Sequence, residues 1–494
     1  MMVRLRLWAK KLSKKRMIVF FFSLLFLFYL LPTFVQVRFD NDLRIDEFYL
    51  GLPGVISGDE PHYFVTTTSL INDHDYYIDN NYDNTYFYGG CDVSFRYVNN
   101  TNPTLWRHIQ IVAPEQRMAF PINISEMHGN DLDEFYKELV VRLQKEYNIT
   151  VARQVSNRPI GLPLLSALFL WPFKNTCFIE NGAIYLSVAI SFIGLIFFFL
   201  TCLFYLKLYR KIDDEKEKET YENENLWIAL SFTAILALCT QYWHYSKTYF
   251  TEPYLAAFLL AAYYLFVIKK QSFMPGLLLS IGFSMKYPFG MYLGIFGMFI
   301  LWKREWKRIV PFIVGASGPI IAVSYYSWLL SGHIFSSAQS SHLFFGNYLQ
   351  GIVFWLLDPT FGLLPFAPFL MFSVLGLQWL WSADRKTFIT IISVIMPYLF
   401  FWTSYTLTQT GAGGYSARYL IPLIAFLVLL SLFWYQQNKN KMLCCIFFAL
   451  VALSFIINIQ AAFLYPLFWN NPPWIVLEFL RYKWIRVLEL WNKF

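Results

Sequence analysis

The feature that most constrains this chain is a series of apolar runs, many of them near the length at which an α-helix crosses a bilayer, which is about 20 residues. The first run covers residues 17–35. The others lie at 181–206, 226–243, 252–268, 273–285, 288–302, 307–330, 362–381, 387–403, 417–434 and 442–465. Because 57% of the residues are hydrophobic and only 15% are charged, the sequence predicts an all-α polytopic membrane protein with about 11 transmembrane helices.

Short basic clusters between these runs predict the orientation. The N-terminal segment before the first run is rich in Lys and Arg, and the basic loops at 269–270, 303–308, 385–386 and 439–441 fall on the same side under strict alternation. Such residues are enriched in cytoplasmic loops. The net charge of +8 therefore indicates membrane orientation rather than nucleic-acid binding. The first run is too long for a signal-peptide core, so it is predicted to remain as a transmembrane helix.

This alternation divides the chain into four parts. Residues 1–36 form a cytoplasmic basic N-terminus and the first helix, 37–180 an exterior loop, 181–465 the helix bundle, and 466–494 an exterior interfacial tail. Within the exterior loop, residues 132–147 have helical apolar spacing and predict an amphipathic helix lying on the membrane. The short, Pro-interrupted segment 158–173 is predicted to be interfacial or re-entrant, and the charged stretch 213–224 a cytoplasmic linker.

Two features are left open by the sequence. Cys91 and Cys177 both lie on the predicted exterior side, where an oxidising compartment would allow a disulfide, but two free thiols fit the sequence equally well. The tail carries Arg481, Lys483, Arg486 and Lys493. An amphipathic interfacial helix explains these charges on the exterior side, whereas a missed span would place the tail inside.

Polar residues gather at the predicted exterior ends of the helices. The acids are Asp59, Glu60, Asp73, Asp75, Glu252 and Asp358, the cations are Lys286 and Arg418, and His62, Tyr63, Tyr245 and Tyr419 accompany them. Such residues also have ordinary structural explanations that require no functional site. An acid at a helix start is favoured by the helix dipole, a lysine can snorkel, and loop carboxylates are usually solvated. An arginine within the start of a membrane helix is costly unless it is paired. Together they predict a site that holds a phosphate beside a carboxylate.

These residues and motifs resemble those of bacterial glycosyltransferases of the GT-C superfamily, relatives of protein O-mannosyltransferases and of the lipid A aminoarabinose transferase. The resemblance rests on Asp-Glu-Pro-His-Tyr at 59–63, Ser-Leu and Asp-x-Asp within 69–75, and Pro-x-Gly-Leu-Pro-Leu-Leu at 159–165. The segments at 245–252, 286, 358–365 and 414–422 follow in the same order. One departure is Arg158, which stands where the family pattern would have histidine.

The resemblance implies an inverting glycosyltransferase that moves a sugar from a polyprenyl-phosphate carrier to an acceptor hydroxyl of a glycan, lipid or protein. The reaction would take place at the exterior face of the plasma membrane. Asp59 would be the general base, with Glu60 orienting a cation or the acceptor. The donor phosphate would be bound by Lys286 and Arg418 with Tyr419 and Tyr245. His62, Tyr63, Asp73, Asp75, Glu252 and Asp358 would support the acceptor or the loops.

Metal use and two other classes of protein stay as alternatives. Asp59, Glu60, Asp73 and Asp75 could hold Mg²⁺ or Mn²⁺ through oxygen, but the resemblance implies that no cofactor is required. A polytopic transporter or lipid flippase would show inverted repeats, discontinuous helices and charges deep within the spans. The sequence shows no clear internal repeat, and its charges gather at one face. A membrane scaffold would leave Lys286 and Arg418 without a role.

Overall fold

The protein is described by a computed structural model covering part of the chain. The described residues are 14–39, 45–50, 60–78, 86–88, 91–93, 109–121, 132–149, 151–156, 158–174, 176, 178–209, 215–334, 348–358, 362–404 and 417–463. Asp59, Cys177 and the tail at 466–494 lie outside them. The predictions for the base, for the cysteine pair and for the side of the tail therefore stay predictions.

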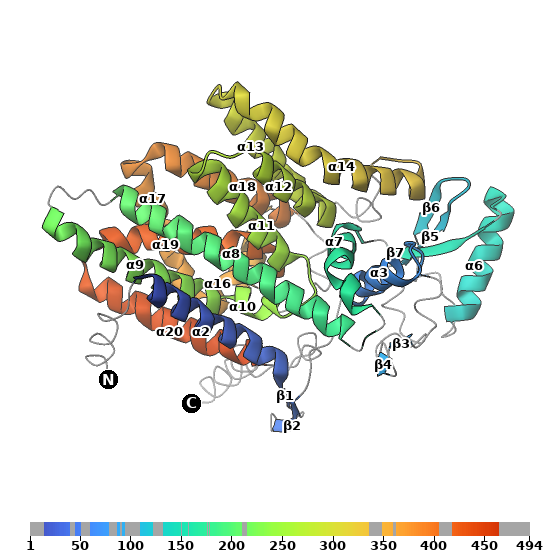
Figure 1. The fold of residues 1–494 in the computed structure, drawn as a ribbon, viewed down its shortest axis with the longest axis horizontal. Coiled ribbons are helices and arrows are strands. Elements are labelled where there is room, and N and C mark those ends of the chain that lie inside the picture. The colour runs from blue at the N-terminus through green and yellow to red at the C-terminus, as the bar shows by residue number, and fades with distance from the viewer. Residues whose placement is uncertain are drawn as a thin grey trace.

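The described chain is mainly helical (Figure 1). Its helices include α2 (Lys14–Phe34), α8 (Ile179–Tyr209), α9 (Glu215–Leu238), α11 (Glu252–Tyr263), α12 (Phe273–Met285), α13 (Met291–Trp302), α14 (Ile309–Ser331), α17 (Phe372–Ala383), α18 (Arg385–Ser404), α19 (Ile421–Gln437) and α20 (Lys441–Phe463). Among the described residues, 6 helices are long and apolar enough to cross a membrane. A multi-pass helical membrane protein is therefore confirmed in outline, while the count of about 11 spans stays a prediction.

One predicted span is broken at prolines. The run at 362–381 divides into α16 (Leu363–Phe366), η7 (Pro368–Met371) and α17, whereas η4 (Tyr287–Gly290) lies between α12 and α13, at the predicted boundary between two spans. Proline removes a backbone donor and clashes with the preceding turn, so a helix cannot continue through it unchanged. The helix α12 has the predicted bounds of 273–285. The helix α11 continues as a π-helical turn, η3 (Tyr264–Ile268), and the two together cover the predicted 252–268.

The predicted linker at 213–224 is helical in the residues that the structure describes. Residues 215–224 form the first turns of α9, and Lys14 of α2 pairs with Glu222 at 2.7 Å. Glu and Lys are strong helix formers, so a charged stretch beside an apolar helix extends it. The helix α15 (Tyr348–Leu357) was not predicted.

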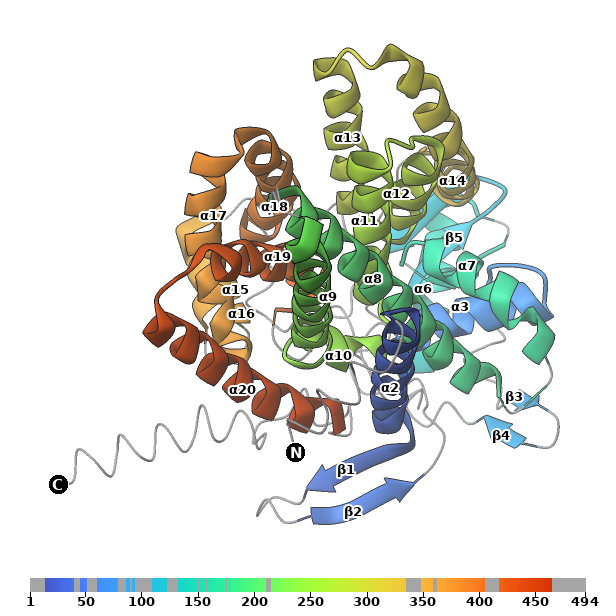
Figure 2. The same ribbon diagram turned by 60° about the vertical axis from the view of Figure 1, so that its left-hand side comes forward.

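The region at 37–180 also contains strands, which the all-α prediction left out. β1 (Val35–Phe39) pairs with β2 (Ile45–Leu50), and β3 (Tyr86–Tyr88) pairs with β4 (Cys91–Val93). A further antiparallel sheet has the order β6 (Met118–Pro121), β5 (Ile109–Ala113), β7 (Arg153–Ser156). The helices α3 (Glu60–Asn72), α6 (Leu132–Tyr147) and α7 (Gly161–Leu170) accompany this sheet, and Figure 2 shows the β1–β2 hairpin extending beyond α2.

The helix α6 has the predicted bounds. Leu139 and Leu143 are buried in one hydrophobic cluster with Ile109 and Ile111 of β5. Figure 1 shows α6 at the edge of the molecule, beyond this sheet. The predicted apolar face of the helix therefore packs in the protein interior. Its predicted location on a membrane stays a prediction.

Contacts between segments predicted to be cytoplasmic agree with strict alternation. The hydroxyl of Tyr209, at the end of α8, donates to Asp384 Oδ2 at 2.9 Å in the turn between α17 and α18. Arg308 donates to Ser272 Oγ at 2.9 Å and to the Phe266 carbonyl at 2.9 Å, which joins two of the basic loops. Each of these segments thus meets another that was assigned to the same side. Which membrane face this is stays a prediction.

The pair α12 and α14 packs with unusually close backbones. A Cβ atom on Gly276 would overlap the carbonyl of Phe312, and one on Gly315 would overlap the carbonyl of Phe273.

We expect Gly276→Ala to lower stability by about 1–3 kcal/mol, because the helices cannot separate without losing contacts. Thermal unfolding in detergent measures this. Gly297→Ala on α13 is the matched control, because nothing lies within 4 Å there, and equal loss in both variants would contradict the prediction.

Candidate functional site

A buried ion cluster brings together three of the predicted site residues. Glu252 Oε1 lies 2.6 Å from Lys286 Nζ and 3.5 Å from Arg418 Nε. The side chains of Glu252, Lys286 and Arg418 are 2%, 12% and 6% exposed. Together these three side chains carry two positive charges and one negative charge. The cluster therefore has a formal net charge of +1, and its positive excess is largely removed from water.

Each of these residues lies at a helix boundary set by a proline. Glu252 begins α11 and is followed by Pro253, whose fixed φ suits the first helical turn. Lys286 has an extended backbone between α12 and η4, before Pro288. Arg418 begins η9 (Arg418–Leu420), which leads into α19 with Pro422. Local sequence thus places the charges where helices end, rather than within them.

Aromatic rings enclose the two cations. Lys286 Nζ lies 3.9 Å from the ring centre of Tyr419 and 4.9 Å from that of Trp402. These two rings stack at 4.1 Å with an interplanar angle of 9°. Arg418 lies over Phe250 at 4.4 Å and donates from Nη2 to the Tyr419 hydroxyl at 2.9 Å. Since cation–π contacts add to the ion pairs, the cations are held in fixed positions.

Glu60 is joined to the same site through the turn that precedes α11. It is the first residue of α3, is buried, and accepts a hydrogen bond from the Tyr249 backbone N–H at 2.5 Å. The Tyr249 hydroxyl also lies 2.9 Å from Thr67 Oγ1 of α3. Phe250, the next residue, underlies Arg418. Glu60 therefore fixes the start of α3 against the turn that ends at Glu252. Its carboxylate also stabilises the charge of the nearby Lys247 ammonium, in keeping with the role toward a cation that the sequence suggested.

Lys247 and His244 were missed by the sequence analysis. Lys247 Nζ donates to the carbonyl of Ala462, and His244 Nδ1 lies 2.9 Å from the carbonyl of Ala461, both at the end of α20. Burial lowers the pKa of Lys247 to about 7, an effect that the Glu60 carboxylate partly offsets. The sequence could have indicated Lys247 as a candidate site residue, because it is a lysine between two spans on the predicted exterior side, as Lys286 is.

This buried lysine predicts a pH-dependent stability. The folded protein releases the Lys247 proton at about pH 7, whereas an unfolded lysine holds it to about pH 10.4. The unfolded state therefore binds more protons between these values, so stability rises with pH across this window, by about 1 kcal/mol per pH unit. Thermal unfolding between about pH 7 and about pH 9 measures the rise. We expect Lys247→Met to flatten it, and an unchanged slope would refute the assignment.

The aromatic and histidine residues that were predicted beside the site form its supporting layer. Tyr245 is buried, with its ring centre 6.0 Å from that of Phe250. His62 and Tyr63 are buried on α3, and the Tyr63 ring lies edge-on to Tyr249 at 6.5 Å. Trp355 of α15 donates its indole N–H to the Trp402 carbonyl at 2.9 Å. Asp358 directly follows this helix and is half-buried, with its carbonyl accepting from the Gly362 N–H at 2.6 Å.

The structure does not bring Asp73 and Asp75 to Glu60. They follow α3, whose 13 residues span roughly 20 Å. Asp75 Oδ1 accepts from Ser69 Oγ and from the Tyr77 N–H, both at 2.9 Å, so it shapes the turn after the helix. Asp73 is exposed. The set of four carboxylates considered for Mg²⁺ or Mn²⁺ is therefore not assembled, while Asp59 lies outside the described residues.

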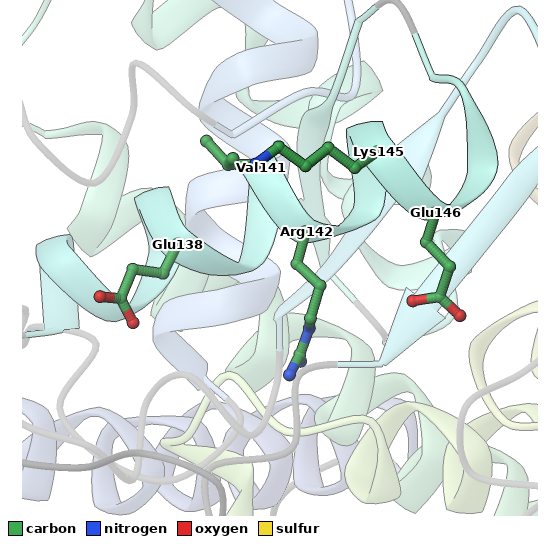
Figure 3. Close-up of a pocket in the computed structure, with 5 residues that line it drawn as sticks. All are labelled: Glu138, Val141, Arg142, Lys145 and Glu146. Atoms are coloured by element: carbon green, nitrogen blue, oxygen red, sulfur yellow. The ribbon is translucent and has the colours of Figure 1, made fainter.

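A shallow hollow lies elsewhere, on the outer side of α6. It is lined by Glu138, Val141, Arg142, Lys145 and Glu146. Figure 3 shows Glu138, Arg142 and Glu146 pointing away from one another rather than toward a common centre. The hollow lies on a solvated helix surface and lacks convergent polar groups. The buried ion cluster is therefore the better candidate site.

No protein-family model, curated protein or solved structure matches this chain. A functional assignment therefore depends on the chemistry of the cluster and on the sequence motifs around it.

Proposed function

We propose that this protein is an inverting glycosyltransferase that moves a sugar from a polyprenyl-phosphate carrier to an acceptor hydroxyl at the exterior face of the plasma membrane. The observation that carries the proposal is the buried cluster of Glu252, Lys286 and Arg418, with a net positive charge at the ends of apolar helices. A lipid-linked phosphate has the charge that this cluster needs and an apolar tail suited to the surrounding helices. The acceptor would be a glycan, a lipid or a protein.

The cations match the charge that develops in such a reaction. As the bond between the anomeric carbon and the phosphate oxygen breaks, the bonding electrons move to the phosphate. Fixed cations at that position lower the barrier, because they need no reorganisation during the step. Lys286 would supply a point charge, and Arg418 would offer a planar fork suited to two phosphate oxygens.

The hydroxyl group that receives the sugar requires a general base. A neutral hydroxyl is a poor nucleophile, so a carboxylate must take its proton as the new glycosidic bond forms on the opposite side of the anomeric carbon. We assign this role to Asp59. Its neighbour Glu60, held by the Tyr249 backbone N–H, anchors this end of α3 to the turn that carries Phe250 and leads to Glu252. That connection supports a shared site for the base and the cations.

The helix break at 362–372 bears on the transporter alternative. Transporters use discontinuous helices whose free backbone groups bind ions or substrate. Here Gln241 Nε2 donates to the Leu363 carbonyl at 3.4 Å, and Asn458 Nδ2 donates to the Phe366 carbonyl at 2.9 Å. Protein side chains thus satisfy both carbonyls, as buried backbone groups require. The break gives no specific support for a transporter.

The test is acceptor-dependent cleavage of the donor. Purified protein in nanodiscs would receive a synthetic polyprenyl-phosphate hexose together with an envelope extract as the acceptor source, and released polyprenyl phosphate would be measured by mass spectrometry. We expect release that depends on the acceptor and is lost in Lys286→Met. Intact donor in every acceptor fraction, together with transbilayer movement of that donor in proteoliposomes, would replace the proposal with a flippase.

A further inference from the structure

Both cations of the cluster meet the same carboxylate oxygen. Glu252 Oε1 lies 2.6 Å from Lys286 Nζ and 3.5 Å from Arg418 Nε, while Oε2 lies 3.4 Å from Thr251 Oγ1. The oxygen Oε1 therefore sits where an anionic ligand shared by the two cations would place one of its own oxygens. In this arrangement the protein supplies its own anion to the cation pair.

The charge of this cluster suits the donor better than the product. A sugar linked through a phosphodiester carries one negative charge, which balances the net charge of the three side chains. The released phosphate monoester carries about −1.5 to −2 near neutral pH, which exceeds it. Charges in a buried site interact strongly. Two cations without Glu252 would therefore retain the product more tightly than the donor.

We infer that Glu252 is a built-in counterion of the phosphate site, which weakens retention of the cleaved polyprenyl phosphate and returns to Lys286 and Arg418 when that product leaves. This inference rests on the proposed function, because it takes the phosphate to bind at these two cations. It assigns Glu252 to product release, whereas the sequence suggested support of the acceptor or a loop.

The first experiment compares binding of donor and product. Wild type and Glu252→Gln in nanodiscs would be titrated with a polyprenyl-phosphate hexose and with polyprenyl monophosphate. We expect Glu252→Gln to bind the monophosphate about tenfold tighter or more, to gain less for the donor, and to turn over more slowly with stronger product inhibition. Glu138→Gln removes one acidic charge on α6, far from the cluster, and is expected to bind both lipids as wild type does.

A double variant tests the charge balance after removing the Glu252–Lys286 ion pair as a whole. Lys286→Met leaves Glu252 and Arg418 with no net charge, so binding of polyprenyl monophosphate should fall. Adding Glu252→Gln restores a net charge of one through Arg418 and removes both members of a buried pair, which proteins tolerate better than the loss of one. We expect the double variant to recover binding relative to Lys286→Met.

The outcomes separate this inference from the proposed function. Weaker monophosphate binding in Glu252→Gln, with no recovery in the double variant, would overturn the counterion role and show that the carboxylate only positions the cations. If Glu252→Gln fails to fold, the comparison of the double variant with Lys286→Met decides alone. Wild-type protein that neither binds nor cleaves the lipid-linked donor would instead overturn the proposed function.

Discussion

Lys286→Met and Arg418→Gln are each expected to lower kcat/KM for the lipid-linked donor by about 10²–10³-fold. Each change removes a fixed positive charge from the position where, in the proposed reaction, the leaving phosphate would gain negative charge. Arg418→Lys should lie between the wild type and Arg418→Gln, because it keeps the charge but loses the planar fork. The measurement is the initial rate of polyprenyl phosphate release at low donor concentration.

The control for this pair is Lys145→Met, on the exposed side of α6. It removes a cation of the same type without touching the cluster and should leave kcat/KM unchanged. Because loss of one member of a buried ion pair also costs stability, thermal unfolding of every variant must accompany the kinetics. A well-folded Lys286→Met protein with wild-type kcat/KM would exclude this lysine from the site.

The cluster could be predicted because its members have a signature that does not depend on distant contacts. Glu252, Lys286 and Arg418 are charges in apolar surroundings, each close to a proline that ends or begins a helix. A charge in such a position needs a partner, and alternation placed all three on one side. The structure confirms that they meet. The predicted membrane side of each residue therefore indicated that these charges lie close together, although they are far apart in the sequence.

The aromatic enclosure could not be predicted in the same way. Trp402 and Phe250 are two among many aromatic residues in a chain that is 20% Phe, Trp and Tyr. What singles them out is the stacking on Tyr419 and the contact with Arg418, which depends on how three separate segments pack. The link from Lys247 to the Ala462 carbonyl is hidden for a related reason, because a backbone acceptor has no residue-type signal.

The strands of the 37–180 region show a further limit. β5 is a short apolar run, and such a run does not distinguish a strand from a buried helix segment. Its pairing with β6 and β7 depends on segments up to 47 positions away in the register, such as Ile109 with Ser156. The apolar spacing of α6 did predict the helix, but nothing in that spacing tells whether a membrane or a sheet covers Leu139 and Leu143.

Asp59→Asn is expected to lower kcat by about 10²–10⁴-fold while leaving the affinity for the donor nearly unchanged. The amide cannot accept the acceptor's proton, whereas Lys286 and Arg418, which would bind the phosphate, are untouched. Equilibrium binding of the donor and single-turnover release of polyprenyl phosphate separate the two effects. A loss of donor affinity equal to the loss of rate would instead assign Asp59 to donor binding.

Glu60→Gln is the matched comparison, because it changes the adjacent acid in the same way. The glutamine carbonyl can still accept the Tyr249 N–H that Glu60 Oε1 accepts at 2.5 Å, so α3 should stay anchored, and only the charge near Lys247 is lost. We therefore expect a much smaller fall in kcat than for Asp59→Asn. The opposite order, with Glu60→Gln inactive and Asp59→Asn near wild type, would move the role of base from Asp59 to Glu60 and leave the cation site as proposed.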